Sequence, residues 1–334
     1  MGTFTNFPNG LTSLGIPLVG DLNPVYGGIP GNVYVVSNPN DPNLTYVQAR
    51  FGNTYYTTPS GVVTQMLQTN LQNAINACAH DRGDVVIVTP HTYVVTTPVL
   101  FNKKGVTVLA SYNITGQDNG ERFMINADAT PGIPAAIISE PTTLIGLGFD
   151  SANTASGVLL GGTIQMGPGS GFDGGSYSRI RDCRFENFGH AVYGIDSQYN
   201  DYVKIEHCDF DGTINGAGGS ANAFTGGVVV TQGHYVTIEE NTFRGCGYAI
   251  VHGTPNPATA AHSNQNFIYK GNRVVVAGGT EKFVNFNTLA TYSLSYGLVA
   301  DNWLGTATDA ASYNDTVANA KTAKVTFSGN HYAE

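Results

Sequence analysis

A six-residue phrase that recurs through the second half of the chain constrains the fold more than any other feature. Each copy reads apolar, any, any, Asn or Cys, any, apolar, and weaker echoes lie at 108–112 and 144–149. The fourth residues of successive copies are 25, 33, 31, 30 and 28 residues apart. A fixed phrase at a drifting period indicates one supersecondary unit that stacks on itself, with its insertions in loops. The copies begin at Ile180, Ile205, Ile238, Tyr269, Val299 and Phe327.

Second apolar runs lie between the phrases, at 190–193, 227–230 and 248–251. We expect each phrase to give a strand, a bend at its Asn or Cys and a second strand, and each following run to give a third strand. Three short strands in a turn of about 30 residues predict an all-β fold, a right-handed parallel β-helix solenoid. Equivalent residues of successive coils then lie about 4.8 Å apart along the axis.

The fourth residue of each phrase is predicted to lie inside the bend, where the copies form one column. In this structural ladder each Asn amide bonds to the next, because a buried amide needs hydrogen-bond partners. Cysteine replaces Asn in the first two coils, and we interpret these thiols as small buried side chains rather than reactive groups. The ladder residues are Cys183, Cys208, Asn241, Asn272, Asn302 and Asn330.

The composition agrees with a β-rich chain. Charged residues make up 12% of the sequence, against about a quarter in a typical soluble domain. The surface must therefore be covered by Asn, Thr, Ser, Gly and Tyr rather than by Lys and Glu. Such a composition is typical of turn-rich β proteins and excludes helical bundles and coiled coils.

The sequence also argues against several classes of partner and cofactor. The net charge is −9 and no basic run is longer than Lys103 and Lys104, whereas nucleic-acid binding needs a cationic stripe that releases counterions. No apolar run reaches the roughly 18 residues of a membrane span, and the first ten residues lack the pattern of a signal peptide. The four cysteines have neither CxxC nor His-paired spacing, so we expect no metal, no cofactor and no disulfide framework.

We expect three segments along the chain. Residues 1–32 hold four Pro and seven Gly, which predicts an extended attachment arm. Residues 33–61 give a strand and loop lead-in, and residues 62–334 give the parallel β-helix. An apolar stripe at a 3.6-residue period predicts a capping helix at about 62–80. The apolar residues with which the arm is expected to bind a partner are Phe4, Phe7, Leu11, Leu14, Ile16, Leu18 and Val19.

The opening of the solenoid resembles a known family. Residues 71–111 read LQNAINACAHDRGDVVIVTPHTYVVTTPVLFNKKGVTVLAS and resemble the start of pectate-lyase-like β-helix proteins. In that family a short amphipathic helix plugs the first coil, and Gly-Asp followed by a β run begins the solenoid. The likeness covers about residues 60–334. The segments at 3–20 and 27–38 look more specifically like β-helix structural proteins of tailed bacteriophages.

This resemblance implies a fold more strongly than an activity, because the family includes lyases, hydrolases, tailspikes and non-enzymatic virion proteins. We expect a non-enzymatic virion structural protein, capsid-associated or a decoration protein, anchored by its N-terminal arm. Its partners would be the major capsid protein or another virion protein, and further copies of itself, with a trimer favoured. Assembly would take place in the reducing cytoplasm of the host bacterium. The alternatives are a tailspike-type polysaccharide lyase or hydrolase and a receptor-recognition protein that binds surface glycans.

The charges within the phrases do not predict a catalytic site. The second positions form the column Arg181, Glu206, Glu239 and Lys270, and the fifth positions form the column Arg184, Asp209, Thr242 and Arg273. Such mixed signs are typical of a solvated face on which neighbouring rungs neutralise each other. Glycosidase chemistry needs two carboxyl groups about 5–10 Å apart. If the chain is an enzyme, the candidate residues are Asp182, Glu206, Asp209 and Asp211.

Overall fold

The structure is a computed structural model of the 334-residue chain. The residues that it describes are 12–13, 16–17, 33–36, 67–88, 92–95, 98–110, 124–127, 135–150, 158–160, 174–186, 190–196, 201–212, 226–232, 234–252, 265–275, 282–286, 295–305, 313–314 and 325–332.

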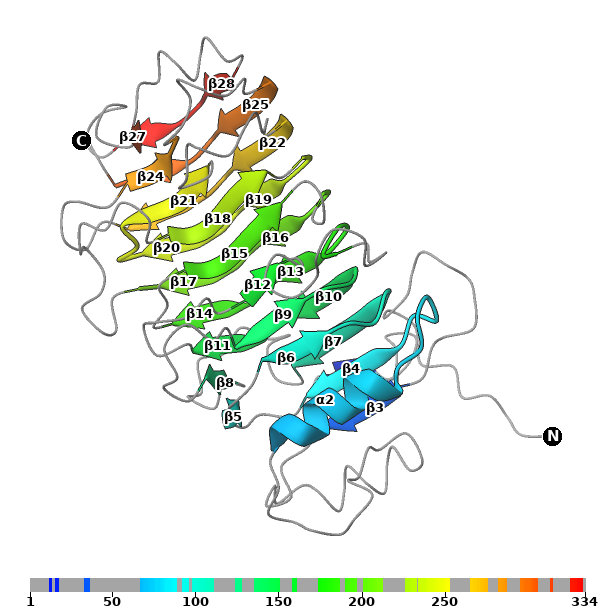
Figure 1. Ribbon diagram of the computed structural model, residues 1–334. Coiled ribbons are helices and arrows are strands. Elements are labelled where there is room, and N and C mark those ends of the chain that lie inside the picture. The colour runs from blue at the N-terminus through cyan, green and yellow to red at the C-terminus, as the bar shows by residue number, and fades with distance from the viewer. Residues whose placement is uncertain are drawn as a thin grey trace.

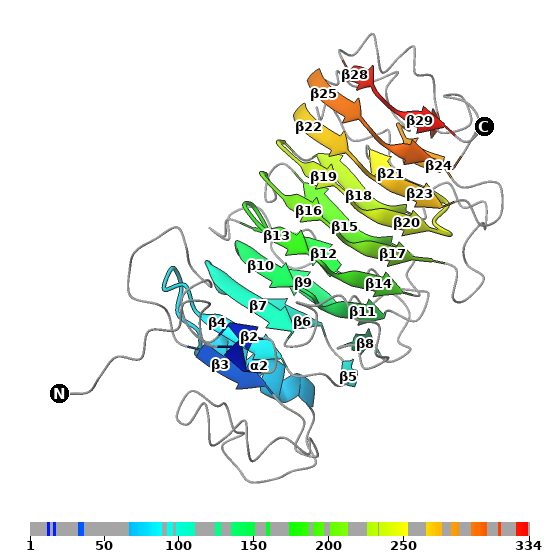
Figure 2. The same ribbon diagram turned by 180° about the vertical axis from the view of Figure 1, so that it is seen from behind.

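Three sheets run along the long axis, and each complete coil contributes one strand to each of them (Figures 1 and 2). The first sheet contains β3 (Val33–Val36), β4 (Val85–Val88), β7 (Val106–Ala110), β10 (Thr142–Ile145), β13 (Arg179–Arg181), β16 (Lys204–Glu206), β19 (Thr237–Glu239), β22 (Gln265–Lys270), β25 (Ser295–Ala300) and β28 (Val325–Ser328).

The second and third sheets follow the same order along the axis. The second sheet contains β5 (Thr92–Val95), β8 (Met124–Ala127), β11 (Gly148–Asp150), β14 (Arg184–Glu186), β17 (Asp209–Asp211), β20 (Thr242–Arg244), β23 (Arg273–Val275), β26 (Trp303–Leu304) and β29 (His331–Tyr332). The third sheet contains β6 (Val99–Phe101), β9 (Ala136–Ile138), β12 (Val158–Leu160), β15 (His190–Asp196), β18 (Gly226–Gln232), β21 (Tyr248–His252), β24 (Lys282–Asn285) and β27 (Tyr313–Asn314).

Successive coils pair in parallel in all three sheets. In the first sheet, for example, Ile180 of β13 pairs with Leu144 of β10 on one side and with Ile205 of β16 on the other. The molecule is a right-handed parallel β-helix. The predicted fold is confirmed, and each complete phrase supplies one strand of the first sheet and one of the second.

The helix α2 (Leu67–Ala77) lies at the end of the solenoid that holds β3 and β4 (Figure 1). Its apolar stripe faces the first coil, where Leu71 and Ile75 are buried against strands β3 to β6. Tyr34 of β3 donates a hydrogen bond from its hydroxyl to the carbonyl of Ala77 at 2.9 Å. The helix is therefore joined to the sheet by both packing and a polar contact.

The helix ends at Ala77, before the predicted end near residue 80. The carboxylate of Asp84 accepts a hydrogen bond from the backbone N–H of Ala79 at 2.7 Å, which draws the chain out of the helix. Arg82 holds the same carboxylate through two contacts of 2.6 Å. The predicted start at about residue 62 lies outside the described residues.

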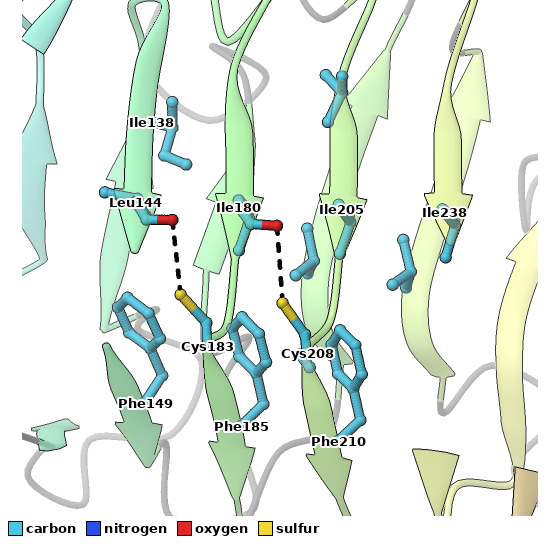
Figure 3. Close-up of a cluster of buried hydrophobic side chains, with 14 of the residues drawn as sticks. Ile138, Leu144, Phe149, Ile180, Cys183, Phe185, Ile205, Cys208, Phe210 and Ile238 are labelled. Carbon is cyan, nitrogen blue, oxygen red and sulfur yellow. Dashed lines mark hydrogen bonds between the residues drawn. The ribbon is translucent and has the colours of Figure 1, made fainter. Parts of the chain in front are cut away.

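Stacked phenylalanines fill the interior beside the second sheet (Figure 3). Successive ring centroids of Phe149, Phe185, Phe210 and Phe243 are 5.3, 4.7 and 4.6 Å apart, and the rings are nearly parallel. Such stacks add attraction beyond the burial of apolar area. They are spaced by the repeat of the coils, so the core is as periodic as the sheets.

Part of the predicted attachment arm is described. Thr12–Ser13 (β1) and Ile16–Pro17 (β2) pair as short antiparallel strands. The side chain of Ile16 lies outside the described part, as do the arm residues Phe4, Phe7, Leu11, Leu14, Leu18 and Val19. The expected partner-binding role of the arm stays a prediction.

Candidate functional site

The bend between the first and second sheets holds a buried column of amides. The side-chain oxygen of Asn272 accepts hydrogen bonds from the backbone N–H and the Nδ2 of Asn241, both at 3.1 Å. The side-chain oxygen of Asn302 accepts from the backbone N–H of Asn272 at 2.9 Å and from its Nδ2 at 3.1 Å. The side-chain oxygen of Asn330 accepts from the backbone N–H of Asn302 at 3.1 Å and from its Nδ2 at 2.9 Å. Each amide thus joins neighbouring coils through both its donor and its acceptor.

Each Asn also reaches back to the preceding coil. Its Nδ2 donates to the carbonyl of the first residue of the preceding phrase, for example from Asn241 to Ile205 at 3.0 Å and from Asn272 to Ile238 at 2.9 Å. An unpaired buried amide would be costly. These bonds explain how a row of polar groups is stable inside the solenoid.

The two cysteines occupy the same column and use the same acceptor (Figure 3). The Sγ of Cys183 lies 3.8 Å from the carbonyl of Leu144 in the preceding coil and 3.3 Å from that of Arg181. The Sγ of Cys208 lies 3.7 Å from the carbonyl of Ile180 in the preceding coil and 3.2 Å from that of Glu206, so each thiol shares its one proton between two acceptors. Burial, and then the neighbouring thiol of Cys183, raise the pKa of Cys208, so it remains a protonated donor. Its backbone N–H donates to Oδ1 of Asn241 at 2.8 Å, where the amide rungs begin. We call Cys183, Cys208, Asn241, Asn272, Asn302 and Asn330 the inner column.

Glu206, one of the candidate acids, lies on the outer face of the first sheet and is nonetheless buried. It forms a salt bridge with Arg179 of the preceding coil and another with Lys204 at 2.8 Å. Burial alone would raise the pKa of Glu206, but hydrogen bonds from Lys204 and Arg179 outweigh it and hold that pKa below its usual range. A general acid in glycoside cleavage needs a raised pKa, so this carboxylate is suited to charge pairing.

The other candidate acids lie at the bend and on the second sheet. Asp211 is buried between two guanidinium groups, with Arg244 at 3.4 Å and Arg184 at 3.9 Å. Asp182 occupies the bend itself, 3.1 Å from Arg181. Asp209 shares β17 with Asp211 and pairs in register with Arg184 and Thr242. The structure therefore gathers these carboxylates among basic side chains, as the mixed signs of the phrases suggested.

Within the described ranges, no group of three or more His, Cys, Asp and Glu side chains is placed to hold a metal ion. In the same part of the chain, no helix has both the length and the apolar character needed to cross a membrane.

Sequence reasoning missed a second column, made of exposed tyrosines at the opposite end of the first-sheet strands. Tyr177, Tyr202 and Tyr235 each lie three residues before a phrase and are 68%, 44% and 46% exposed. We call these three residues the tyrosine column. The sequence does contain a signal for this column, because a tyrosine stands three residues before the first apolar residue of three phrases. Tyr296 stands at the same position in a later coil.

The rings of the tyrosine column are stacked face to face. Tyr177 and Tyr202 have centroids 4.8 Å apart with planes 7° from parallel, and Tyr202 and Tyr235 are 4.5 Å apart at 3°. Burial by the two neighbouring rings, and their phenol groups, raise the pKa of Tyr202. The phenol of Tyr202 is therefore a neutral donor and acceptor near neutral pH.

The backbone of these tyrosines is left-handed, with φ of 60°, 59° and 56° for Tyr177, Tyr202 and Tyr235. Residues with a Cβ adopt this conformation at a cost, and glycine adopts it freely. Gly105 has the equivalent place in an earlier coil, with φ of 76°. The bend needs the conformation, but it does not need an aromatic side chain.

Comparisons with known proteins concern the fold. No protein-family model matches the chain, and no curated protein matches it. ORF18 of Geobacillus virus E2 is 15% identical with a TM-score of 0.48, over 81% of this chain and 48% of that one. Carrot pectin methylesterase is 12% identical with a TM-score of 0.47, over 92% of this chain and 84% of that one.

A third solved structure is the tailspike protein of E. coli bacteriophage HK620 in complex with a pentasaccharide. It is 14% identical with a TM-score of 0.48, over 82% of this chain and 49% of that one. The chain thus spans about half the length of either phage protein. None of these likenesses carries an inference about what this chain does or binds.

Proposed function

We propose that the chain is a non-enzymatic structural protein of a bacteriophage particle, capsid-associated or a decoration protein, anchored through residues 1–32. The observation that carries the non-enzymatic part is the pairing of the acidic side chains. Glu206 lies against Arg179 and Lys204, and Asp211 lies between Arg184 and Arg244. Carboxylates paired with basic side chains in this way are poorly placed to act as the proton donor that glycoside cleavage requires, and the pKa of Glu206 is in addition held below its usual range.

The assignment to a phage particle is supported by the sequence of the first 38 residues, which looks like that of phage β-helix structural proteins. The arm precedes the first strand of the solenoid, because β3 at Val33–Val36 pairs with β4 and is the edge strand of the first sheet. In this proposal the solenoid forms a homo-oligomer, with a trimer favoured, and the arm binds the major capsid protein or another virion protein. Assembly takes place in the host cytoplasm.

The test combines native mass with an activity assay. We expect the full-length protein to associate with itself or with purified capsid protein, and a chain that lacks residues 1–32 to remain folded by circular dichroism and to lose the association. Incubation with mixed bacterial polysaccharides should release no new reducing ends. Release of ends that is lost in Asp209→Asn or Asp211→Asn would replace this proposal with a tailspike-type lyase or hydrolase.

A second candidate function is recognition of a host surface through glycans without cleavage. The observation that favours it is the tyrosine column, which places three exposed aromatic rings in a row along the axis. A sugar-binding screen in which oligosaccharides bind and remain intact would select this function over catalysis.

A further inference from the structure

The tyrosine column is a surface that the fold does not require. The backbone bonds that hold the bend come from main-chain atoms, since the N–H of Tyr177 donates to the carbonyl of Asp201 at 2.8 Å and that of Tyr202 to the carbonyl of His234 at 2.9 Å. A glycine would make the same bonds without strain. Strained residues that are not needed for packing are a sign of function.

The stack leaves a specific set of contacts open. Tyr202 has a ring on each side, whereas Tyr177 at the first end of the column is stacked on one side and is more exposed, at 68% against 44%. Tyr177 is therefore the most accessible ring of the tyrosine column. Beside it, the phenol edges of Tyr202 and Tyr235 present a row of hydroxyl groups that both donate and accept hydrogen bonds.

The charges around the column indicate an uncharged ligand. Asp201 and His234, which precede two of the tyrosines, lie 3.6 Å apart and form a pair. The nearest basic side chains on the following strands, Arg179 and Lys204, form salt bridges with Glu206. Phosphate, sulfate and carboxylate ligands would have to compete with these acids, so the site is better suited to a neutral one.

The geometry points to a binding site for a neutral glycan at the tyrosine column, with one sugar ring packed against the exposed ring of Tyr177 and further hydroxyls bonded to Tyr202 and Tyr235. A pyranose ring has an apolar C–H face that packs on an aromatic face and a rim of hydroxyls that match phenols. The column follows the solenoid axis, so a linear chain of sugars can contact successive rungs. This inference rests on the second candidate function and gives it a place on the molecule.

The chain offers a matched control for this site. Tyr296 has the same position before its phrase and the same left-handed backbone, with φ of 63°, and is 57% exposed. Asn266 occupies the coil between it and Tyr235, so Tyr296 is separated from the stack. Glycine fits the backbone at either position, and therefore Tyr177→Gly and Tyr296→Gly should both fold.

The experiment is saturation-transfer NMR and titration of the full-length protein with neutral oligosaccharides of glucose, galactose and N-acetylglucosamine. We expect at least one to bind, Tyr177→Gly to weaken that binding more than about tenfold, and Tyr296→Gly to leave it unchanged. Circular dichroism and melting curves establish that both variants are folded.

Three results would overturn the inference: no binding at millimolar sugar, equal binding by Tyr177→Gly and the unaltered protein, or an equal loss in Tyr296→Gly. Binding restricted to acidic oligosaccharides, or tyrosine-dependent association with a protein in place of a sugar, would also overturn it. Each of these results leaves the proposed particle role standing, because that role is tested through residues 1–32 and the native mass.

Discussion

Two columns lie at the two ends of the first-sheet strands, and they reverse the usual places of polar and aromatic side chains. The inner column follows the strands and buries amides such as Asn272, while the tyrosine column precedes them and exposes rings such as Tyr202. Buried amides are stable only where every group is paired, and here the repeat supplies the pairs. Exposed rings need no such partners. The difference indicates that the inner column specifies the fold and the tyrosine column serves the surface.

The largest expected effect comes from breaking the inner column. Asn272→Leu removes the acceptor of Asn241 and the donor to Ile238, and we expect the free energy of unfolding to fall by about 1–3 kcal/mol for each group left unpaired. Urea unfolding followed by circular dichroism measures it. Asn330→Leu, at a half-buried position, should cost less. An unchanged stability in Asn272→Leu would mean that the amide bonds contribute nothing.

Loss of a cysteine from the inner column should lower the stability less than loss of an asparagine. Cys208→Ala loses one weak sulfur donor, shared between the carbonyls of Ile180 and Glu206, and a small volume, so we expect a loss of about 1 kcal/mol. Cys246→Ala is the control, because Cys246 is buried outside the column. A loss in Cys208→Ala as large as that in Asn272→Leu would remove the distinction between the two kinds of rung.

The stability contributed by Glu206, on the outer face of the first sheet, should depend on pH. Because the pKa of Glu206 is lowered in the folded protein, its pairing adds stability above the unfolded value of about 4.3 and loses it as the pH falls through the lower folded value. We expect Glu206→Gln to be less stable at neutral pH and to show a smaller drop below about pH 4. Unfolding midpoints across a pH series measure this. Glu240→Gln, at an exposed position, should behave like the unaltered protein.

The smallest effect on stability is expected from the tyrosine column. Tyr202→Gly loses two stacking contacts and releases a left-handed residue from strain, and these changes oppose each other. We therefore expect a melting temperature close to that of the unaltered protein. A fall comparable to that of Asn272→Leu would show that the exposed rings hold the coils together, and the contrast between the columns would disappear.

The repeat predicted the fold because its apolar and Asn or Cys positions have to meet the same neighbours in every coil. The pairing of Ile180 with Leu144 and Ile205 follows directly from the phrase. The charge pairing on the outer face was also foreseeable, since Arg181 and Glu206 share one column of mixed sign. These features depend on the spacing at which the phrase repeats, and that spacing can be read directly from the sequence.

The tyrosine column and the end of α2 depend on conformation instead. A left-handed backbone is expected for glycine and is not signalled by Tyr177 or Tyr202. The end of the helix is set by the contact of Asp84 with the N–H of Ala79, whereas the apolar period continues to Cys78. Local backbone geometry and single hydrogen bonds of this kind leave little trace in residue type.

The change from thiols to amides also has a consequence for how the molecule opens. In a solenoid each coil contacts its neighbours, so cooperativity is set by the strength of each interface in turn. The coils from Asn241 to Asn330 share two-way amide links, while those of Cys183 and Cys208 are joined through this column by sulfur bonds of 3.7–3.8 Å. The amide links already reach the coil of Cys208, because Asn241 accepts from the backbone N–H of Cys208 and donates to the carbonyl of Ile205. The change in this column therefore lies between the coils of Cys183 and Cys208, and we expect amide hydrogen exchange to be slower from the Cys208 coil onward than on the Cys183 side.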